Sequence, residues 1–191
     1  MKILLSGAIA CVLFCSCNNA AESVSAKADS NEVKTTAKEK ATETVSLPYT
    51  ADYSTKFSPG NPAHTKLVLD FYKLFETDKL DEMKPLLGDS VMAEFADGTK
   101  FNGTPDSLIS MGKKYRAEMS EYKYKFDTWL SMHSDDKNED WVLVWSRAYF
   151  TYKGKGGKQD SLRVHEYYQI KDNKIVYWSE FNQKFPTPKK K

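Results

Sequence analysis

The chain has 191 residues with 28 Lys and Arg against 26 Asp and Glu, a formal net charge of +2, and 13% of its residues are aromatic. A charge this close to neutral argues against nucleic acid as a partner. The three cysteines are Cys11, Cys15 and Cys17, so the remainder of the chain holds neither a disulfide framework nor a cysteine–zinc site.

The N-terminal segment has the pattern of a secretory signal. Lys2 precedes an apolar run, Ile3–Phe14, that is shorter than the roughly 20 residues a membrane-spanning helix needs. The small residue Ser16 before Cys17 resembles the lipidation signal of bacterial lipoproteins. This resemblance implies a signal peptide over residues 1–16 and several acyl chains, such as palmitate, on Cys17. The protein is then expected in the cell envelope as a lipid-anchored lipoprotein of the outer membrane, facing the periplasm or the cell surface.

A change in composition divides the rest of the chain. Residues 17–46 carry Ala, Ser, Thr, Glu and Lys without an aromatic residue, which is typical of a disordered tether. The aromatic residues begin at Tyr49, so a folded domain is expected over residues 47–187, followed by a short basic tail over residues 188–191.

Two cap signals predict the longer helices. Asn61-Pro62 places an N-cap before a proline at the first helical position, and Thr104-Pro105 repeats this pattern. The first helix has an apolar stripe at Leu67, Val68, Phe71, Leu74 and Phe75. The buried side of the later helix is expected to run from Leu108 to Met119. Between the two helices, a short helix over 78–87, a strand over 90–95 and a turn at Asp97-Gly98 are expected.

Strands dominate the second half of the domain. They are expected over residues 122–132, 141–152, 160–171 and 174–181, with a polar loop over 133–140. In the first of them, Tyr122, Tyr124, Phe126 and Leu130 share one face, and Asp172-Asn173 forms a two-residue hairpin turn before the last. Helices followed by an antiparallel meander indicate an α+β domain with the helices packed on one face of a curved sheet.

This order of elements resembles the nuclear transport factor 2-like superfamily, which includes the SnoaL-like polyketide cyclases and ketosteroid isomerases. The resemblance covers residues 62–183 and rests on Leu86–Val91, Asp97–Thr99, Asn102-Gly103 and Val164–Ile175. It implies a cone, as in cystatin-like folds, whose open end is often a ligand pocket. Enzymes, binding proteins and partner-docking modules all use this fold, so the fold does not decide the function.

The functional positions of the ketosteroid isomerases can be carried over one by one. Their helix tyrosine falls on Phe71 and their catalytic base on Phe95, and neither side chain can move a proton. Their third position, a carboxylic acid, falls on Glu166. The chain therefore does not look like an isomerase of that type, and an enzyme is not the favoured interpretation.

Glu166 is the sharpest candidate from strand alternation alone, because it shares an apolar face with Val164 and Tyr168. A carboxylate buried without a partner costs several kcal/mol, or keeps its proton with a raised pKa. One interpretation is a neutral acid that donates a hydrogen bond to a ligand oxygen. The other is a glutamate paired with a tyrosine hydroxyl or placed at the wet mouth of the cone. The expected pocket residues are Phe71, Phe95, Glu166, Tyr168, Trp178 and Glu180, the last two placed inside by the resemblance.

A second surface is expected on the outside of the sheet. Trp145, Arg147 and Tyr149 share one face of their strand, which the resemblance makes the convex face that relatives use to dimerise. Their composition is that of an interface core, for a homodimer or another protein. The alternative is that the segment 47–57 folds back and covers this face.

No metal and no cofactor are expected. His64, His133 and His165 do not form a spaced ligand cluster, and Gly154–Lys158 joins two strands instead of opening a helix as a P-loop does. The sequence thus predicts a membrane-anchored domain that binds a small, mainly apolar ligand or a protein partner. The alternative is an enzyme of the dehydratase, cyclase or isomerase type that uses Glu166, with Glu180, as acid and base.

Overall fold

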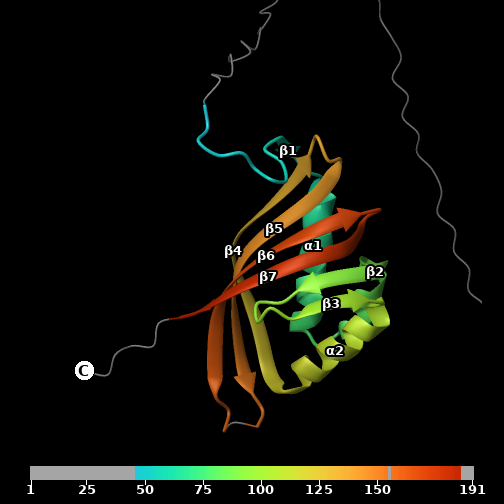
Figure 1. The fold of residues 1–191 in the computed structure, drawn as a ribbon. Helices are drawn as coiled ribbons and strands as arrows, with labels where there is room; N and C mark the ends of the chain where they lie inside the picture. Colours follow the sequence, from blue (N-terminus) through green and yellow to red (C-terminus); the bar gives the residue numbers. More distant parts are fainter. Residues whose placement is uncertain (1–45, 155, 186–191) are drawn as a thin grey trace, which may run out of the picture. The chain divides into compact units, whose positions relative to one another are not determined.

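The structure is a computed structural model and describes residues 46–154 and 156–185 (Figure 1). The predicted signal peptide, the lipidated Cys17, the tether up to residue 45 and the basic tail lie outside the described residues. A compact unit begins at Leu47. Within the described part of the chain, no helix combines the length and apolarity needed to cross a membrane.

Both cap signals start helices where they were predicted. The side chain of Asn61 accepts the N–H of Ala63 at 2.9 Å and opens α1 (Pro62–Glu76). The Thr104 hydroxyl caps α2 (Pro105–Ala117) in the same way. The short helix between them is a 3₁₀ helix, η1 (Leu80–Leu86), with Pro85 inside it. A proline has no N–H to donate, which disfavours a regular α-helix here.

The described strands form one seven-stranded sheet in the order β1-β4-β5-β6-β7-β2-β3. The strands are β1 (Phe57–Pro59), β2 (Leu87–Glu94), β3 (Lys100–Gly103), β4 (Met119–Ser134), β5 (Glu139–Tyr152), β6 (Gln159–Lys171) and β7 (Lys174–Lys184). Strands β4 to β7 are the predicted antiparallel meander. The sheet is mixed because β2 pairs with β7 in parallel, with Ala93 opposite Trp178. The α+β prediction is therefore confirmed.

The predicted turn between β6 and β7 is also confirmed. Asp172 and Asn173 both have positive φ, 52° and 56°, as a two-residue hairpin turn of the primed type requires. The register of β6 and β7 then shifts between Gln169 and Ile170, which brings Tyr168 opposite Trp178 and Glu166 opposite Glu180. The functional site described below depends on that register.

Two expectations about buried faces were wrong. Met119 is buried, but it begins β4 and is not part of the preceding helix, which ends at Ala117. Leu130 does not share the buried face of Tyr122, since it is 51% exposed and Tyr122 only 7%. The cause is a register shift between Phe126 and Thr128, where an irregularity breaks the alternation of β4.

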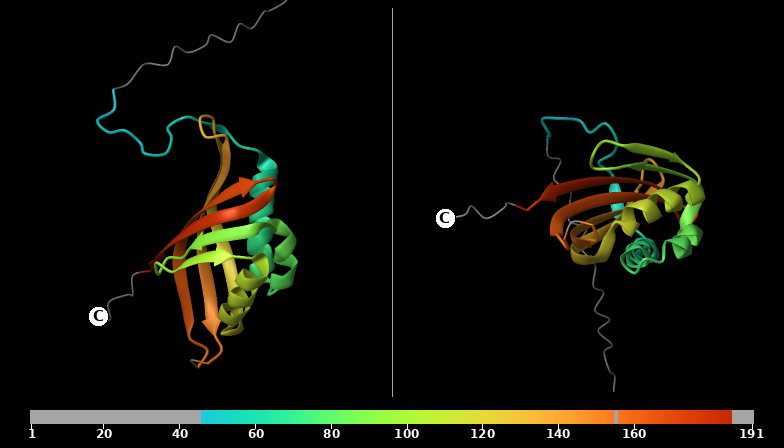
Figure 2. Two further views of the ribbon diagram at one scale, coloured as in Figure 1. Left: turned by 45° about the vertical axis from the view of Figure 1, so that its right-hand side comes forward. Right: turned by 90° about the horizontal axis from the view of Figure 1, so that it is seen from below.

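The sheet curves, and the helices lie on its concave side (Figure 2). The core between them includes side chains from α1 and from the inner faces of β5 and β6, such as Val68, Tyr72, Val144 and Tyr168, and η1, β2 and α2 also contribute to it. All four are at most 3% exposed. The packing is incomplete toward α2, and the space that remains is the candidate site.

Candidate functional site

A cavity of about 410 Å³ lies between the helices and the concave face of the sheet. Its walls come from α1, η1, α2, the turn after β2, and the inner faces of β4, β6 and β7. This volume lies within the range of about 300–1,000 Å³ that is typical of small-molecule sites. The domain therefore has room for a ligand inside its cone.

The six residues predicted to line a pocket all line this one cavity. They are Phe71, Phe95, Glu166, Tyr168, Trp178 and Glu180. Alternation along the last strand left its inner face undecided, and the structure places Trp178 and Glu180 inside, as the resemblance implied. The ring of Phe71 meets the ring of Trp178 at 5.8 Å between centroids, and Phe95 meets it at 6.1 Å from the other side.

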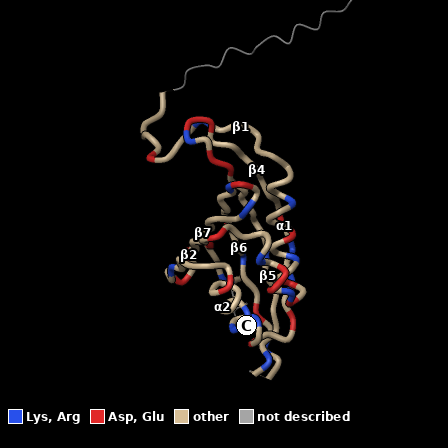
Figure 3. The backbone as a smooth tube through the Cα atoms, turned by 90° about the vertical axis from the view of Figure 1, so that its right-hand side faces the viewer, with Lys and Arg blue, Asp and Glu red and all other residues tan. Residues whose placement is uncertain are grey.

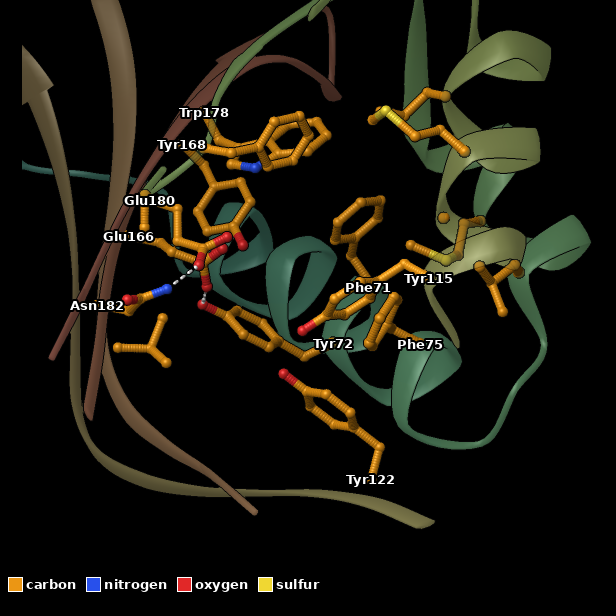
Figure 4. A pocket seen from close by; sticks show the side chains of 18 of the residues that line it. Phe71, Tyr72, Phe75, Tyr115, Tyr122, Glu166, Tyr168, Trp178, Glu180 and Asn182 are labelled. Atoms are coloured by element: carbon orange, nitrogen blue, oxygen red, sulfur yellow. Dashed lines mark hydrogen bonds between the residues drawn. The ribbon is translucent and has the colours of Figure 1, made fainter. Parts of the chain in front are cut away.

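A pair of carboxyl groups occupies one end of the cavity. Glu166 on β6 is paired directly with Glu180 on β7, and Figure 4 shows the two side chains next to each other. Burial raises the pKa of the Glu166 carboxyl to about 8, and the charge of Glu180 adds to this shift. Burial also raises the pKa of Glu180, whose Oε1 accepts a 2.9 Å hydrogen bond from Nδ2 of Asn182. The pair consequently retains a proton at neutral pH.

Tyr72 on α1 holds the inner carboxyl in place. Its hydroxyl donates a hydrogen bond to Oε2 of Glu166, and its ring packs edge-on against Tyr124 at 4.7 Å. Of the two interpretations of Glu166, pairing with a tyrosine hydroxyl is the observed arrangement, and this paired acid still lines the cavity. The hydrogen bond lowers the pKa of Glu166, against the larger effect of burial.

Sequence reasoning missed Tyr72 and Asn182. The ketosteroid isomerase tyrosine was carried over to Phe71, whereas the neighbouring residue is the one that touches the acid. A signal was present, because His64, Val68 and Tyr72 follow one another at intervals of four residues, which is helical spacing, and all three are buried in α1. Asn182 was missed because β7 runs to Lys184, beyond the predicted end of the strand at residue 181.

The charges of the cavity differ from those of the outer surface. Lys, Arg, Asp and Glu are interspersed along the described chain, and exposed acids such as Asp70 and Asp81 form ion pairs with lysines (Figure 3). The residues that line the cavity include Asp97, Glu166 and Glu180 but no Lys, Arg or His. The cavity is therefore an acidic chamber in an otherwise charge-balanced domain.

The predicted outer surface is only partly covered. Trp145 and Tyr149 are 36% and 41% exposed, and Arg147 forms an ion pair with Asp127. The segment before β1 packs elsewhere, with Tyr53 accepting a 2.9 Å hydrogen bond from Nε1 of Trp141. The covering expected from segment 47–57 thus reaches Trp141 and leaves the predicted interface residues accessible.

The three histidines lie at separate places. His64 is buried in α1, with Nε2 3.3 Å from Oδ1 of Asn173, and His165 stacks on Trp145 at 4.6 Å on the outer face. His133 was expected in a loop, but β4 continues through it, and its Nδ1 lies 2.9 Å from Oδ1 of Asp140. None of the three lines the cavity.

The curved sheet around α1, with a cavity at its open side, is the nuclear transport factor 2-like fold, as the resemblance implied. Solved structures with this fold include a protein from Jannaschia sp. CCS1 assigned as a SnoaL-like polyketide cyclase. It is 12% identical, the match covers 66% of this chain and 89% of that chain, and the TM-score is 0.55. An LEH-like epoxide hydrolase of M. tuberculosis is 14% identical over 64% of this chain and 84% of that chain, with a TM-score of 0.53.

A further protein assigned as a SnoaL-like polyketide cyclase, from Shewanella denitrificans OS-217, is 11% identical with a TM-score of 0.54. The match covers 64% of this chain and 92% of that chain. No protein-family model matches the sequence, and no curated protein matches it. At these identities the similarity establishes the fold and leaves the function to the site.

Proposed function

We propose that the domain binds a small, mainly apolar molecule in the cavity, with the polar group of the ligand at Glu166. One observation carries this proposal, namely that a cavity of about 410 Å³ is lined mainly by aromatic and aliphatic side chains and holds a pair of carboxyl groups. Phe71, Phe95 and Trp178 form the apolar side, and the Glu166–Glu180 pair forms the polar end. Such a combination of apolar walls with few convergent polar groups is typical of ligand sites.

Native mass spectrometry of the protein, produced without its first 17 residues, tests this proposal. We expect a small molecule to be retained by the wild type and lost from Phe95→Trp, whose larger ring fills the cavity. Phe181→Trp is the matched control, because Phe181 is 54% exposed and lies outside the cavity. A protein that stays free of ligand after exposure to cell extract, in the wild type and in the control, would contradict the proposal.

A second candidate function is acid–base catalysis of the dehydratase, cyclase or isomerase type. The observation that favours it is the pairing of two carboxyl groups whose pKa values are both raised. Such a pair can hold one protonated and one ionised member at neutral pH, as acid–base catalysis requires. Several proteins with this fold are assigned as cyclases or hydrolases.

The two candidates differ in what happens to the bound molecule. For an enzyme, the retained molecule is converted on incubation, and Glu166→Gln abolishes the change in mass while leaving the molecule bound. For a binding protein, the molecule is recovered unchanged from both forms. Glu121→Gln, which replaces an exposed glutamate of β4, is the control for the substitution itself.

We also propose that the protein is anchored to a membrane of the cell envelope through lipid on Cys17. The support is the sequence pattern around Ser16-Cys17, which lies outside the described residues. Metabolic labelling with an alkyne analogue of palmitate tests the anchor. We expect label on the wild type and none on Cys17→Ser, which should also leave the membrane fraction, and a labelled Cys17→Ser would contradict the proposal.

A further inference from the structure

We propose that the ligand of the cavity is a cation, an amine or quaternary ammonium compound with an apolar body, whose positive charge lies at the Glu166–Glu180 pair. This inference rests on the proposed function, that the cavity binds a small molecule, and it names the chemical class of that molecule. It is carried by the charges that line the cavity and by the aromatic rings around them.

The first argument is the imbalance of charge inside the cavity. Asp97, Glu166 and Glu180 line it, and no Lys, Arg or His does. The ion pairs of the described residues join other acids to bases on the surface, and neither Glu166 nor Glu180 belongs to one. An anionic ligand would be repelled in this chamber, whereas a cation supplies the missing counter-charge.

The second argument is the arrangement of the rings. Phe71, Tyr72, Tyr168 and Trp178 meet one another at centroid distances of 5.8–6.3 Å at the end of the cavity that holds the carboxyl pair. In Figure 4 the ring of Tyr168 lies beside the two carboxyl groups, and Trp178 lies on the far side of Tyr168. Ring faces attract a cation within about 6 Å, and quaternary ammonium groups are recognised in this way. A ring of aromatic side chains next to two carboxyl groups therefore suits an ammonium group better than a neutral oxygen.

The third argument concerns the proton that the pair holds without a ligand. The titratable groups facing Glu166 are Tyr72 from α1, Tyr122 and Tyr124 from β4, Tyr168 from its own strand and Glu180 from β7. The residue opposite it on β5 is Val144, which does not titrate. Burial raises the pKa of each tyrosine hydroxyl, so these tyrosines stay neutral and only the carboxyl pair changes charge near pH 8.

A bound cation favours the ionised form of this pair and must displace its proton. The affinity for a cation is then expected to rise as the pH increases through about 8, the pKa of Glu166, and to level off above it. A neutral ligand that accepts a hydrogen bond from the protonated acid has the opposite dependence. The direction of the pH effect therefore separates the two kinds of ligand.

Isothermal titration calorimetry with two probes of equal shape tests the proposal on the purified protein. Phenyltrimethylammonium carries a permanent charge, and tert-butylbenzene is its neutral isostere. We expect the cation to bind at least about tenfold more tightly than the isostere at about pH 9, with a smaller preference at about pH 6. Because the quaternary probe has no proton to lose, any proton released on binding comes from the protein, and buffers of different ionisation enthalpy measure it.

Substitutions of the two glutamates test whether the carboxyl pair causes the preference for the cation. Glu166→Gln and Glu180→Gln keep the size of the side chain, and each should reduce the preference for the cation and the release of protons. Glu121→Gln, on the outside of β4, should change neither. If one glutamine variant fails to fold, the other provides the same comparison.

The outcomes separate this inference from the proposed function. If the neutral isostere binds as tightly as the cation at both pH values, the cation proposal is wrong and the apolar ligand site stands. If neither probe binds and the protein retains no ligand in native mass spectrometry, both proposals are wrong. A preference for the cation that persists in both glutamine variants also overturns the assignment to the carboxyl pair.

Discussion

The inner and outer faces of the sheet both carry aromatic side chains, but they use them differently. Inside, Phe71 meets Tyr168 at 71° and Trp178 at 62°, Tyr168 and Trp178 stack at 25°, and a cavity remains between these rings and the helices. Outside, the rings of Trp145, His165 and Phe181 lie nearly parallel across three strands, at 22° and 24°. Aromatic content alone therefore does not identify a ligand site, because both faces carry packed rings and, of these rings, only the inner ones line a cavity.

The two faces also differ in whether their acidic side chains have a basic partner. On the outer face Asp127 is paired with Arg147, while on the inner face two glutamates face each other without a base. A buried acid without a base beside it costs stability that a purely structural core would not need to lose. This difference supports the ligand site proposed on the concave face, and four predictions test the comparison.

The largest expected effect is a change in the free energy of unfolding with pH, caused by Glu166 on the inner face. The folded protein holds the Glu166 proton up to about pH 8, whereas the unfolded chain releases it near the ordinary pKa of 4.5. The unfolded state thus binds fewer protons in this window, so the free energy of unfolding falls as the pH rises from about 4.5 to 8. At about 1.4 kcal/mol per pKa unit the loss is on the order of 4–5 kcal/mol.

Urea denaturation at several pH values measures this effect. Glu166→Gln should remove most of the fall and gain stability relative to the wild type above pH 8. Glu121→Gln on the outer face should keep the profile of the wild type. Parallel profiles for the wild type and Glu166→Gln would show that Glu166 does not hold its proton in the folded protein.

The next effect compares one tryptophan on each face. Trp178 is 5% exposed and packs against Phe71, Phe95 and Tyr168, whereas Trp145 is 36% exposed. We expect Trp178→Ala to lower the free energy of unfolding by about 3 kcal/mol and Trp145→Ala by about 1 kcal/mol or less. Equal losses in chemical denaturation would mean that the outer face is as much a part of the core as the inner one.

A smaller effect is expected from the hydroxyl that supports the acid. Tyr72→Phe removes the hydrogen bond to Glu166, which should cost about 1–2 kcal/mol of stability and raise the pKa of Glu166 further. Nuclear magnetic resonance of the labelled glutamate carboxyl carbons measures this pKa directly. Tyr149→Phe on the outer face is the matched control and should leave the pKa unchanged. A lower pKa in Tyr72→Phe would contradict the arrangement described for the pair.

The smallest effect concerns the outer face itself, which we propose as the surface for a second copy of the chain. Arg147→Ala breaks an exposed ion pair and should change monomer stability by less than about 1 kcal/mol. In sedimentation experiments the wild type should form a dimer, which Trp145→Ala and Arg147→Ala weaken without altering the cavity. A wild type that sediments as a monomer at all concentrations would remove this assignment.

Much of the fold followed from local chemistry in the sequence. Asn61 and Thr104 cap their helices through hydrogen bonds to residues two or three positions away, so their effect is visible in a short window. Strand alternation placed Glu166 and Tyr168 of β6 on one face in a similar way, whereas Trp178 and Glu180 of β7 were placed inside only by the resemblance.

The remaining features depend on contacts that no short window contains. Tyr72 reaches Glu166 across 94 positions of sequence, and the parallel pairing of β2 with β7 also joins segments that are far apart in the chain. The register shift after Phe126 exposes Leu130 against its alternation. These features determine which elements close the cavity and which side chain holds Glu166. The sequence therefore predicted residues that line the site, but not how they contact one another.

The parallel contact between β2 and β7 also bears on the order in which the protein folds. β7 lies between β6 and β2 in the sheet, although it is the last strand of the chain. During synthesis α1, η1 and β2 emerge from the ribosome before β7. Because β2 pairs with β7, β2 can join the sheet only after β7 has been made, and such long-range pairing slows folding. The cavity is consequently completed only when β7 joins the sheet, and a nascent chain without β7 exposes the apolar lining that the finished protein encloses.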